Sequence, residues 1–430
     1  MLAFLKKDKG LFSYILVLIS DRLIGLCLIY FLVRSISDEY FAYWTQVNFL
    51  PGALCGILGL GLGRGVLRLL VDNEYSKKLV RNILMTICII FIFVSLSSYL
   101  IILLLNDPAI NTFMGGITYP YRGSIFLMLF IMLEGIFEIF INYLRAKFSD
   151  RFVYYMALRI LPRIIIGLLI VVLQLDFWLS FTIYFVLSAS ILLFLFFTVM
   201  STIDEKHENA LFNFEEYVSL LKKFLKYSVP LMLAALALPI LNIIIRGQLF
   251  QEDGYSQLGV LSIYMSFIGI LVYFPEAFQT YIFPRLVQSS KKGKEGKKEI
   301  NYQLGVSIGF SLFICIVFSL IGFYLLDIIY PKNEWVLIDS IFIAVTSFLW
   351  ILFSSFQKFF LVYFAIKTQL LTLISFLSLA LGSLVVYSNF LSGPLNSILG
   401  LISYFFLSSI LLISLFIFFK NNNNAPHSNL

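Results

Sequence analysis

The chain has 430 residues, of which 60% are hydrophobic and only 13% are charged, with a formal net charge of +7. Soluble domains carry about 25% charged residues, and a soluble chain of this size could not cover so much apolar surface with polar groups. The composition therefore excludes a soluble enzyme, a nucleic-acid-binding domain and a disordered chain. The apolar runs are nearly continuous and lack the alternation of a β-barrel. Because one spanning helix needs about 20 apolar residues, we expect an all-α polytopic membrane protein with about twelve spans.

In chain order, we predict spans at 12–33, 42–63, 82–105, 123–144, 152–173, 177–199, 227–248, 257–284, 303–326, 338–365, 369–387 and 395–419. The first run follows three lysines, as in a signal peptide, but it is long and has no evident cleavage site, so we interpret it as a retained span. Most Lys and Arg residues fall in segments on the side of the N-terminus. The positive-inside rule then predicts that both termini are cytoplasmic.

The chain divides near residue 205 into an N-lobe, 1–205, and a C-lobe, 206–430, with six predicted spans in each. The C-lobe begins with an acidic and polar linker, in which 214–224 could form an amphipathic helix at the membrane surface. Because six is an even number, both lobes would have the same topology. We therefore expect parallel repeats related by a pseudo-two-fold axis along the membrane normal.

Two pairs of like charges lie inside the predicted N-lobe spans. Glu134 and Glu138 are four residues apart in the fourth span, and Arg159 and Arg163 are four apart in the fifth, so each pair shares one helix face. In an antiparallel hairpin, two residues lie at the same depth when they are equally far from the connecting loop. This rule predicts that Glu138 meets Arg159 and that Glu134 meets Arg163. The sequence leaves open whether these residues latch the helices together or line a cavity.

Other polar residues at membrane depth are also candidates for function, because ionisable groups there are costly. Asp21 and Arg22 lie in the middle of the first span, and Glu276 follows a proline in the eighth. Asn242 and Arg246 lie in the second half of the seventh span. Polar residues also hold membrane helices together, which is their commoner use.

Motifs for other chemistries are absent from the sequence. There is no GxxxxGK[ST] nucleotide loop and no HExxH pair, the four cysteines lie inside apolar runs, and the two histidines cannot build a metal site together. We therefore expect no enzyme activity, no cofactor, no metal and no nucleic-acid partner. A polar-lined bundle of two halves is typical of a secondary transporter.

Several loose motifs resemble those of O-antigen flippases of the Wzx type, within the superfamily that includes polysaccharide exporters, lipid II flippases and multidrug antiporters. The most specific is 221–232 (LKKFLKYSVPLM), a basic lead-in followed by Pro-Leu, and Arg246 and Phe283-Pro284 also fit. Val33-Arg34 followed by Asp38-Glu39-Tyr40 resembles the end of the family's first span. The sequence departs from the pattern at Phe41 and Leu261, where the family often has Gly and Tyr.

The resemblance implies a short oligosaccharide joined through diphosphate to a polyprenyl lipid as substrate, and a V-shaped cavity that opens alternately to each side of the bacterial inner membrane. It also implies contact with membrane lipids, coupling to H⁺ or Na⁺, and polysaccharide polymerase and chain-length proteins as partners. On this basis we expect substrate-binding residues at Arg22, Arg159, Arg163, Arg246 and Asn242, and ion-coupling residues at Asp21, Glu134, Glu138 and Glu276.

Two alternatives remain at this stage. One is a cation-coupled multidrug or small-metabolite antiporter of the same fold. The other is a glycan polymerase or ligase, which usually has a large outer loop. The longest predicted outer loop here is only 106–122, which argues against the second alternative.

Overall fold

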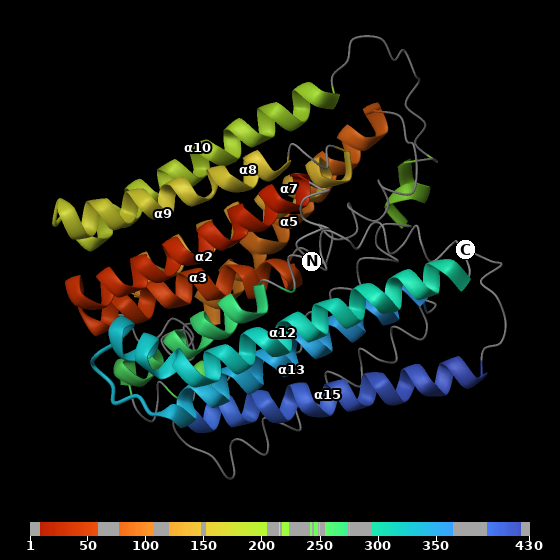
Figure 1. Cartoon of the computed structure of the whole chain (residues 1–430). Helices are drawn as coiled ribbons and strands as arrows, with labels where there is room; N and C mark the ends of the chain where they lie inside the picture. Colours follow the sequence, from red (N-terminus) through yellow and green to blue (C-terminus); the bar gives the residue numbers. More distant parts are fainter. Residues whose placement is uncertain are drawn as a thin grey trace. The chain divides into compact units, whose positions relative to one another are not determined.

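The computed structural model describes residues 9–58, 77–105, 120–147, 152–203, 215, 217–222, 241–242, 245–247, 249, 254–273, 275, 294–363 and 394–422. Regular secondary structure in these ranges is helical, which confirms the predicted all-α fold (Figure 1). The chain forms two compact units, one of Asp8–Ser262 and the other mainly of Ile263–Leu430.

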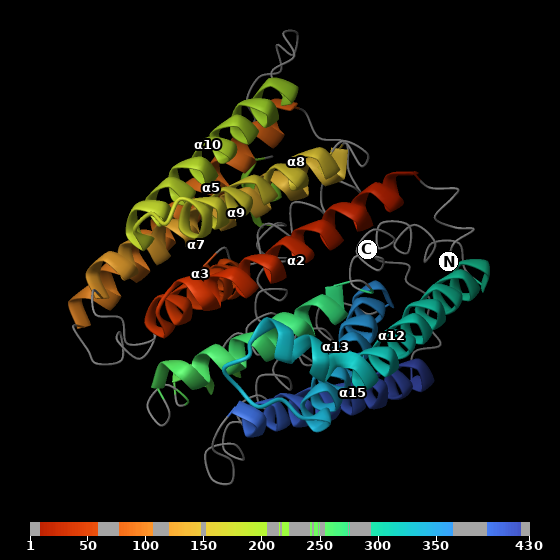
Figure 2. The same ribbon diagram turned by 60° about the vertical axis from the view of Figure 1, so that its left-hand side comes forward.

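The first unit contains α2 (Lys9–Ser35), α3 (Asp38–Leu58), α5 (Lys77–Leu105), α7 (Pro120–Lys147), α8 (Phe152–Leu158), α9 (Ile160–Gly167), the π-helical turn η1 (Leu168–Val172) and α10 (Phe177–Ile203). Helix α7 packs against α3, α5 and α10. Helix α9 packs against α2 and α10, as the two ribbon views show (Figure 2). The fifth predicted span is therefore inserted between the first and the sixth.

The second unit contains α12 (Lys294–Ile329), α13 (Leu337–Tyr363) and α15 (Pro394–Asn422), with α13 packed against both of the others (Figure 1). A buried carboxylate fixes the start of α13. Asp339 accepts a hydrogen bond from the Tyr264 hydroxyl at 2.5 Å and another from the Val336 backbone N–H at 2.8 Å. Since both donors are satisfied by one charged acceptor, this is a strong local anchor.

Nine helices among the described residues are long and apolar enough to cross a membrane: Leu16–Ser35, Leu79–Ser97, Ser124–Leu144, Val153–Val172, Phe177–Ile203, Gly254–Tyr273, Gly305–Ile329, Leu337–Phe356 and Ile398–Leu415. Each overlaps a predicted span. The second predicted span overlaps helix α3, whereas the seventh lies mostly, and the eleventh wholly, outside the described residues. The total of twelve spans and the cytoplasmic termini stay predictions.

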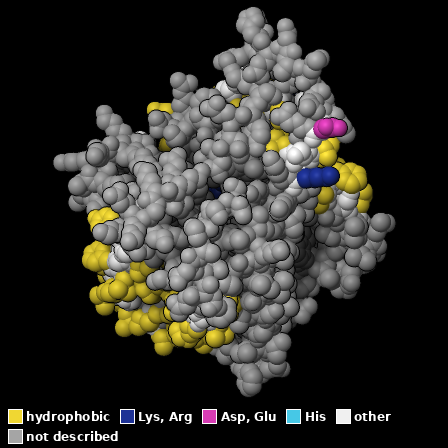
Figure 3. Space-filling view, turned by 90° about the vertical axis from the view of Figure 1, so that its right-hand side faces the viewer, with side chains coloured by type: hydrophobic (Ala, Val, Ile, Leu, Met, Phe, Trp, Pro, Cys, Tyr) yellow, Lys and Arg dark blue, Asp and Glu magenta, His cyan; other side chains and the backbone are white. Residues whose placement is uncertain are grey.

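Large hydrophobic side chains remain on the outside of these helices. Among them, Ile89, Phe93, Phe197 and Leu320 are each more than 60% exposed. Where the space-filling view colours side chains, most of them are hydrophobic, chiefly at its lower left (Figure 3). In water such surface would be costly, but hydrocarbon is its natural solvent, which agrees with helices in contact with lipid.

The fifth span is not one regular helix, because it contains Pro162. Proline has no N–H to donate to the carbonyl of Leu158, four residues earlier, and its ring crowds that carbonyl. Accordingly α8 ends at Leu158, and the Arg159 N–H donates to the Met156 carbonyl at 3.2 Å. The helix resumes as α9 and ends in the π-helical turn η1, so α9 is a short segment between two irregular joints.

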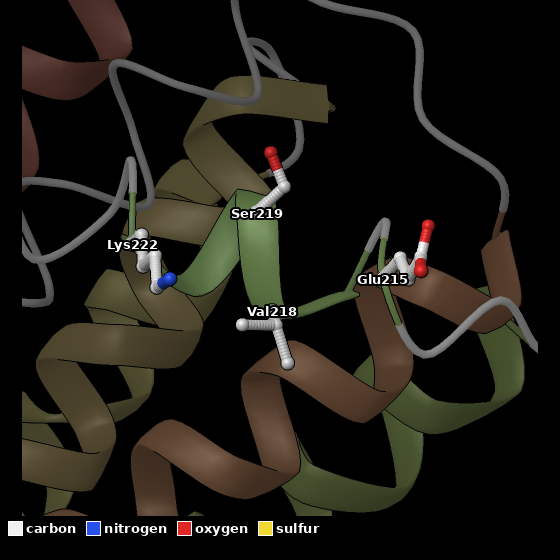
Figure 4. Close-up of a pocket in the computed structure, with 4 residues that line it drawn as sticks. All are labelled: Glu215, Val218, Ser219 and Lys222. Carbon is white, nitrogen blue, oxygen red and sulfur yellow. The ribbon is translucent and has the colours of Figure 1, made fainter.

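Part of the predicted amphipathic linker is helical. Residues 217–222 form a short helix, and the Tyr217 hydroxyl lies 2.6 Å from the Thr86 hydroxyl of α5. A pocket of about 340 Å³ opens beside it (Figure 4), lined by Glu215, Val218, Ser219 and Lys222. The interaction between these two hydroxyls holds the linker against α5.

The contact between α5 and α7 depends on Gly135. A Cβ atom at this position would lie 2.1 Å from the ring of Phe91, which is fully buried. We expect Gly135→Ala to destabilise the protein by about 1–3 kcal/mol, because an added methyl forces a packed core apart. Thermal unfolding in detergent, followed with a thiol-reactive dye on buried Cys88 and Cys315, measures this loss.

Gly25→Ala is the matched control, because a Cβ at Gly25 would meet nothing within 4 Å. This control should unfold at or slightly above the wild-type temperature. Adding Phe91→Leu to Gly135→Ala should restore part of the loss. Equal unfolding temperatures for Gly25→Ala and Gly135→Ala would refute the tight contact.

Candidate functional site

Two ion pairs join three of the N-terminal helices. The first links α2 to α9, where Arg163 Nη1 lies 2.5 Å from Asp21 Oδ1. Both side chains are well buried, with exposed fractions of 16% for Arg163 and 14% for Asp21. A charge taken out of water in this way needs an opposite charge nearby, so each residue explains the presence of the other.

The second ion pair links α7 to the break between α8 and α9. Arg159 Nη2 lies 2.5 Å from Glu134 Oε2, and the exposed fractions are 34% and 26%. The Arg159 guanidinium also lies over the Phe137 ring, 5.5 Å from its centroid, which is within the range of a cation–π contact. This pair is more open than the first.

Electrostatic interactions join the two ion pairs into one network. Besides Asp21, Arg163 is attracted by Glu134 and repelled by Arg159, and it lies close to Tyr184 of α10. A small pocket of about 30 Å³ lies beside the network, lined by Phe130, Leu133, Glu134, Phe137, Arg159, Pro162, Tyr184, Ser188, Ile191 and Leu192. That volume is large enough for one water molecule, and the lining includes polar side chains that could bond to it.

The predicted pairing of these residues is wrong in its details. Arg159 meets Glu134 rather than Glu138, and Arg163 meets Asp21 rather than Glu134. The prediction assumed a regular hairpin of the fourth and fifth spans. Instead, the fifth span breaks at Arg159, and α9 packs against α2 and α10, so Arg163 faces α2.

Two further predicted residues lie beside this network. Glu138 is half-buried on α7, one turn from Glu134, and within the described part of the chain it makes no hydrogen bond and no ion pair. Arg22 is half-buried on α2 and interacts electrostatically with Asp21. The structure therefore brings Asp21, Glu134, Arg159 and Arg163 into one network. Arg22 follows Asp21 on α2, and Glu138 lies one turn after Glu134 on α7.

A second polar location lies at the end of the first unit. Arg246 is only 3% exposed, and its Nη1 donates to the Ser262 hydroxyl at 3.3 Å. Its guanidinium stacks on the ring of Phe49 at 4.5 Å from the centroid. Asn242, four residues earlier, is 1% exposed. Both residues are thus buried, as expected for polar groups that face the interior of a bundle, whereas Glu276 lies outside the described residues.

Sequence reasoning missed Tyr184 and Phe137 as members of the network. The sequence could have indicated Tyr184. Arg163 lies before the turn at 173–176, and Tyr184 follows this turn by a similar number of residues. In an antiparallel hairpin, such positions have similar depth. Nothing in the sequence distinguishes Phe137 from the other 45 phenylalanines of the chain.

Metal binding gains no support from this geometry. Among the described residues, no three His, Cys, Asp or Glu side chains are close enough together to hold a metal ion.

Solved structures of membrane transporters share this architecture. An inward-facing multidrug resistance MATE family transporter of the MOP superfamily matches with a TM-score of 0.67 and 13% identity, over 96% of this chain and 100% of the other. The chain has the fold of MOP-superfamily transporters. The lipid II flippase MurJ, in an inward closed conformation, matches with a TM-score of 0.61 and 15% identity, over 96% and 93% of the two chains.

A MOP superfamily transporter from Pyrococcus furiosus is also similar, with a TM-score of 0.62 and 14% identity over 96% and 98% of the two chains. No protein-family model and no curated protein matches the sequence. At 13–15% identity these likenesses establish the fold, and this fold carries transporters with different substrates.

The Asp21–Arg163 pair gives a direct prediction for stability. We expect Arg163→Leu to cost about 3–5 kcal/mol, because it leaves the buried Asp21 carboxylate without its partner. Asp21→Leu combined with Arg163→Leu should cost much less, because neither charge is then buried alone. Unfolding by SDS in mixed micelles measures both. A double variant as unstable as the sum of the two single variants would contradict the pairing.

Proposed function

We propose that this chain is a flippase that moves a polyprenyl-diphosphate-linked oligosaccharide, such as an O-antigen repeat unit, from the cytoplasmic to the periplasmic leaflet of a bacterial inner membrane. Alternating access between an N-lobe, 1–205, and a C-lobe, 206–430, would carry the polar head group across while the lipid tail stays in the bilayer. The fold shared with both MATE transporters and a lipid II flippase supports a transport function of this kind.

The observation that carries the proposal is the environment of Arg246. Its guanidinium is almost completely buried, yet its contacts with the described residues are a neutral hydroxyl and an aromatic ring. No carboxylate among the described residues lies within ion-pair distance of it. A buried cation without a counter-charge is costly, and guanidinium groups bind phosphate oxygens in a bidentate manner. An anionic diphosphate would supply the missing charge.

Arg22 is the second proposed diphosphate contact, with Asp21 orienting it. The other residues of the N-terminal network would then have divided roles, in which Arg159 and Arg163 contact substrate and the carboxylates Glu134 and Glu138 take part in coupling to H⁺ or Na⁺. Glu276 and Asn242 would have corresponding coupling and substrate-binding roles in the rest of the protein. Polysaccharide polymerase and chain-length proteins are the proposed partners.

The alternative is a cation-coupled antiporter for drugs or small metabolites, which the MATE likeness supports equally well. Such a protein would need carboxylates available to a cationic substrate. In the described part of the N-terminal unit, Asp21 and Glu134 are both neutralised by arginines. This pairing argues against Asp21 and Glu134 as sites for a cationic substrate, whereas Glu138, which makes no ion pair among the described residues, stays open to one.

Reconstitution tests the proposal. In proteoliposomes without ATP, the wild type should transfer a fluorescent polyprenyl-diphosphate oligosaccharide between leaflets. Arg246→Gln should reduce the initial rate about tenfold or more, because a charge-assisted hydrogen bond contributes about 1.5–3 kcal/mol. Arg246→Lys should retain part of the rate, since the charge remains but the planar fork is lost.

Lys332→Gln is the matched control, because Lys332 is an exposed basic residue and its replacement should leave the rate unchanged. Export of a soluble cationic compound, with no transfer of any lipid-linked glycan, would support the antiporter instead.

A further inference from the structure

Glu138 is a carboxylate of α7 that takes part in neither of the two ion pairs. It lies within the membrane-spanning part of α7, is half-buried, and contacts no cation or hydrogen-bond donor among the described residues. An ionisable group at membrane depth is costly, and a retained one is expected to have a partner in some state of the protein. The partner should therefore be sought among cations that can move.

Arg159 is the cation placed to reach it. Glu134 and Glu138 are four residues apart, so their carboxylates share one face of α7 and lie about 6 Å apart along its axis. In the structure, Arg159 forms its ion pair with Glu134, and its guanidinium lies over the ring of Phe137. The ring of Phe137 thus provides a favourable surface for the guanidinium between the two carboxylates.

The backbone around Arg159 would permit such a movement. Arg159 lies at the joint between α8 and α9, where Pro162 removes a helical hydrogen bond. Helix α8 packs against α7 and α2, whereas α9 packs against α2 and α10. The more buried Asp21–Arg163 pair holds α9 on α2. One side of the joint is therefore anchored, and the other side carries the more open ion pair.

We propose that Glu138 is the second binding position of the Arg159 guanidinium, and that α8 shifts along α7 by one helical turn as Arg159 passes from Glu134 to Glu138. One-turn shifts of one element along another are a known form of switching between two packed states. The inference rests on the proposed transport function for its purpose, since the shift would be the movement of the N-lobe during alternating access. Glu138 is then a positioning residue, which acts through Arg159.

Distance measurements between spin labels test the exchange without any substrate. Labels are attached to cysteines at two exposed positions, Ile125 on α7 and Tyr154 on α8, after replacement of the four native cysteines. In lipid nanodiscs, the full-length protein should show two distance populations that differ by up to about 6 Å, the rise of four helical residues.

Neutral variants should select one population each. Glu138→Gln should keep only the shorter distance, because Arg159 has no second partner, and Glu134→Gln should shift the protein to the longer distance. Asp327→Asn, a matched neutralisation at an exposed position of α12, should leave the distribution as in the wild type. If Glu138→Gln and Glu134→Gln both leave the distribution unchanged, the exchange is overturned.

A transport readout separates this inference from the proposed substrate. Glu138→Gln should also slow transfer of the lipid-linked glycan about tenfold, although the side chain makes no contact in the described state. A wild type that shows the variant-dependent distances but moves no lipid-linked glycan would overturn the proposed substrate and support the exchange. Normal transfer by Glu138→Gln, with an unchanged distance distribution, would overturn the exchange alone.

Discussion

The ion pair between Asp21 and Arg163 is the interaction on which the N-terminal unit depends. An isolated charge inside an apolar helix bundle is costly, and a close opposite charge or several hydrogen bonds must offset that cost. The pair fixes α9 against α2, and this places Tyr184 and the second pair, Glu134–Arg159, around the same point. A set of apolar helices that could pack in many ways thereby acquires one specific arrangement.

The same constraint orders the rest of the described structure. Asp339 is buried and satisfied by Tyr264 and by a backbone N–H at the start of α13. Arg246 is buried with a ring and a hydroxyl, but without a carboxylate among the described residues. Most buried charges among the described residues thus have an opposite charge or a hydrogen-bond donor beside them, and Arg246 is where we propose that an anion binds. Most of the net charge of +7 falls in the predicted loops, because the charges within the predicted spans nearly cancel.

The sequence was sufficient to predict the helical class, the described spans and the four charged residues of the network, but not Tyr184 and Phe137. Hydropathy alone decides the first two, because lipid tolerates only helices or closed barrels. The partners within the network were not predictable from equal depth in a hairpin. Equal depth predicts a contact only between two regular helices, and Pro162 breaks the fifth span near Arg159. In addition, the partner of Arg163 comes from a third helix, α2, which lies outside the hairpin.

The fold does not distinguish one substrate from another, since similar structures include both a multidrug resistance transporter and a lipid II flippase. What is specific to this chain is the distribution of its few membrane charges. The most direct test of the account is an experimental structure in lipid nanodiscs with a short-chain polyprenyl-diphosphate glycan. The account predicts diphosphate density within about 3 Å of the Arg246 guanidinium, with Arg163 still on Asp21. A diphosphate bound far from Arg246, or an Asp21 carboxylate with no cation beside it, would contradict the account.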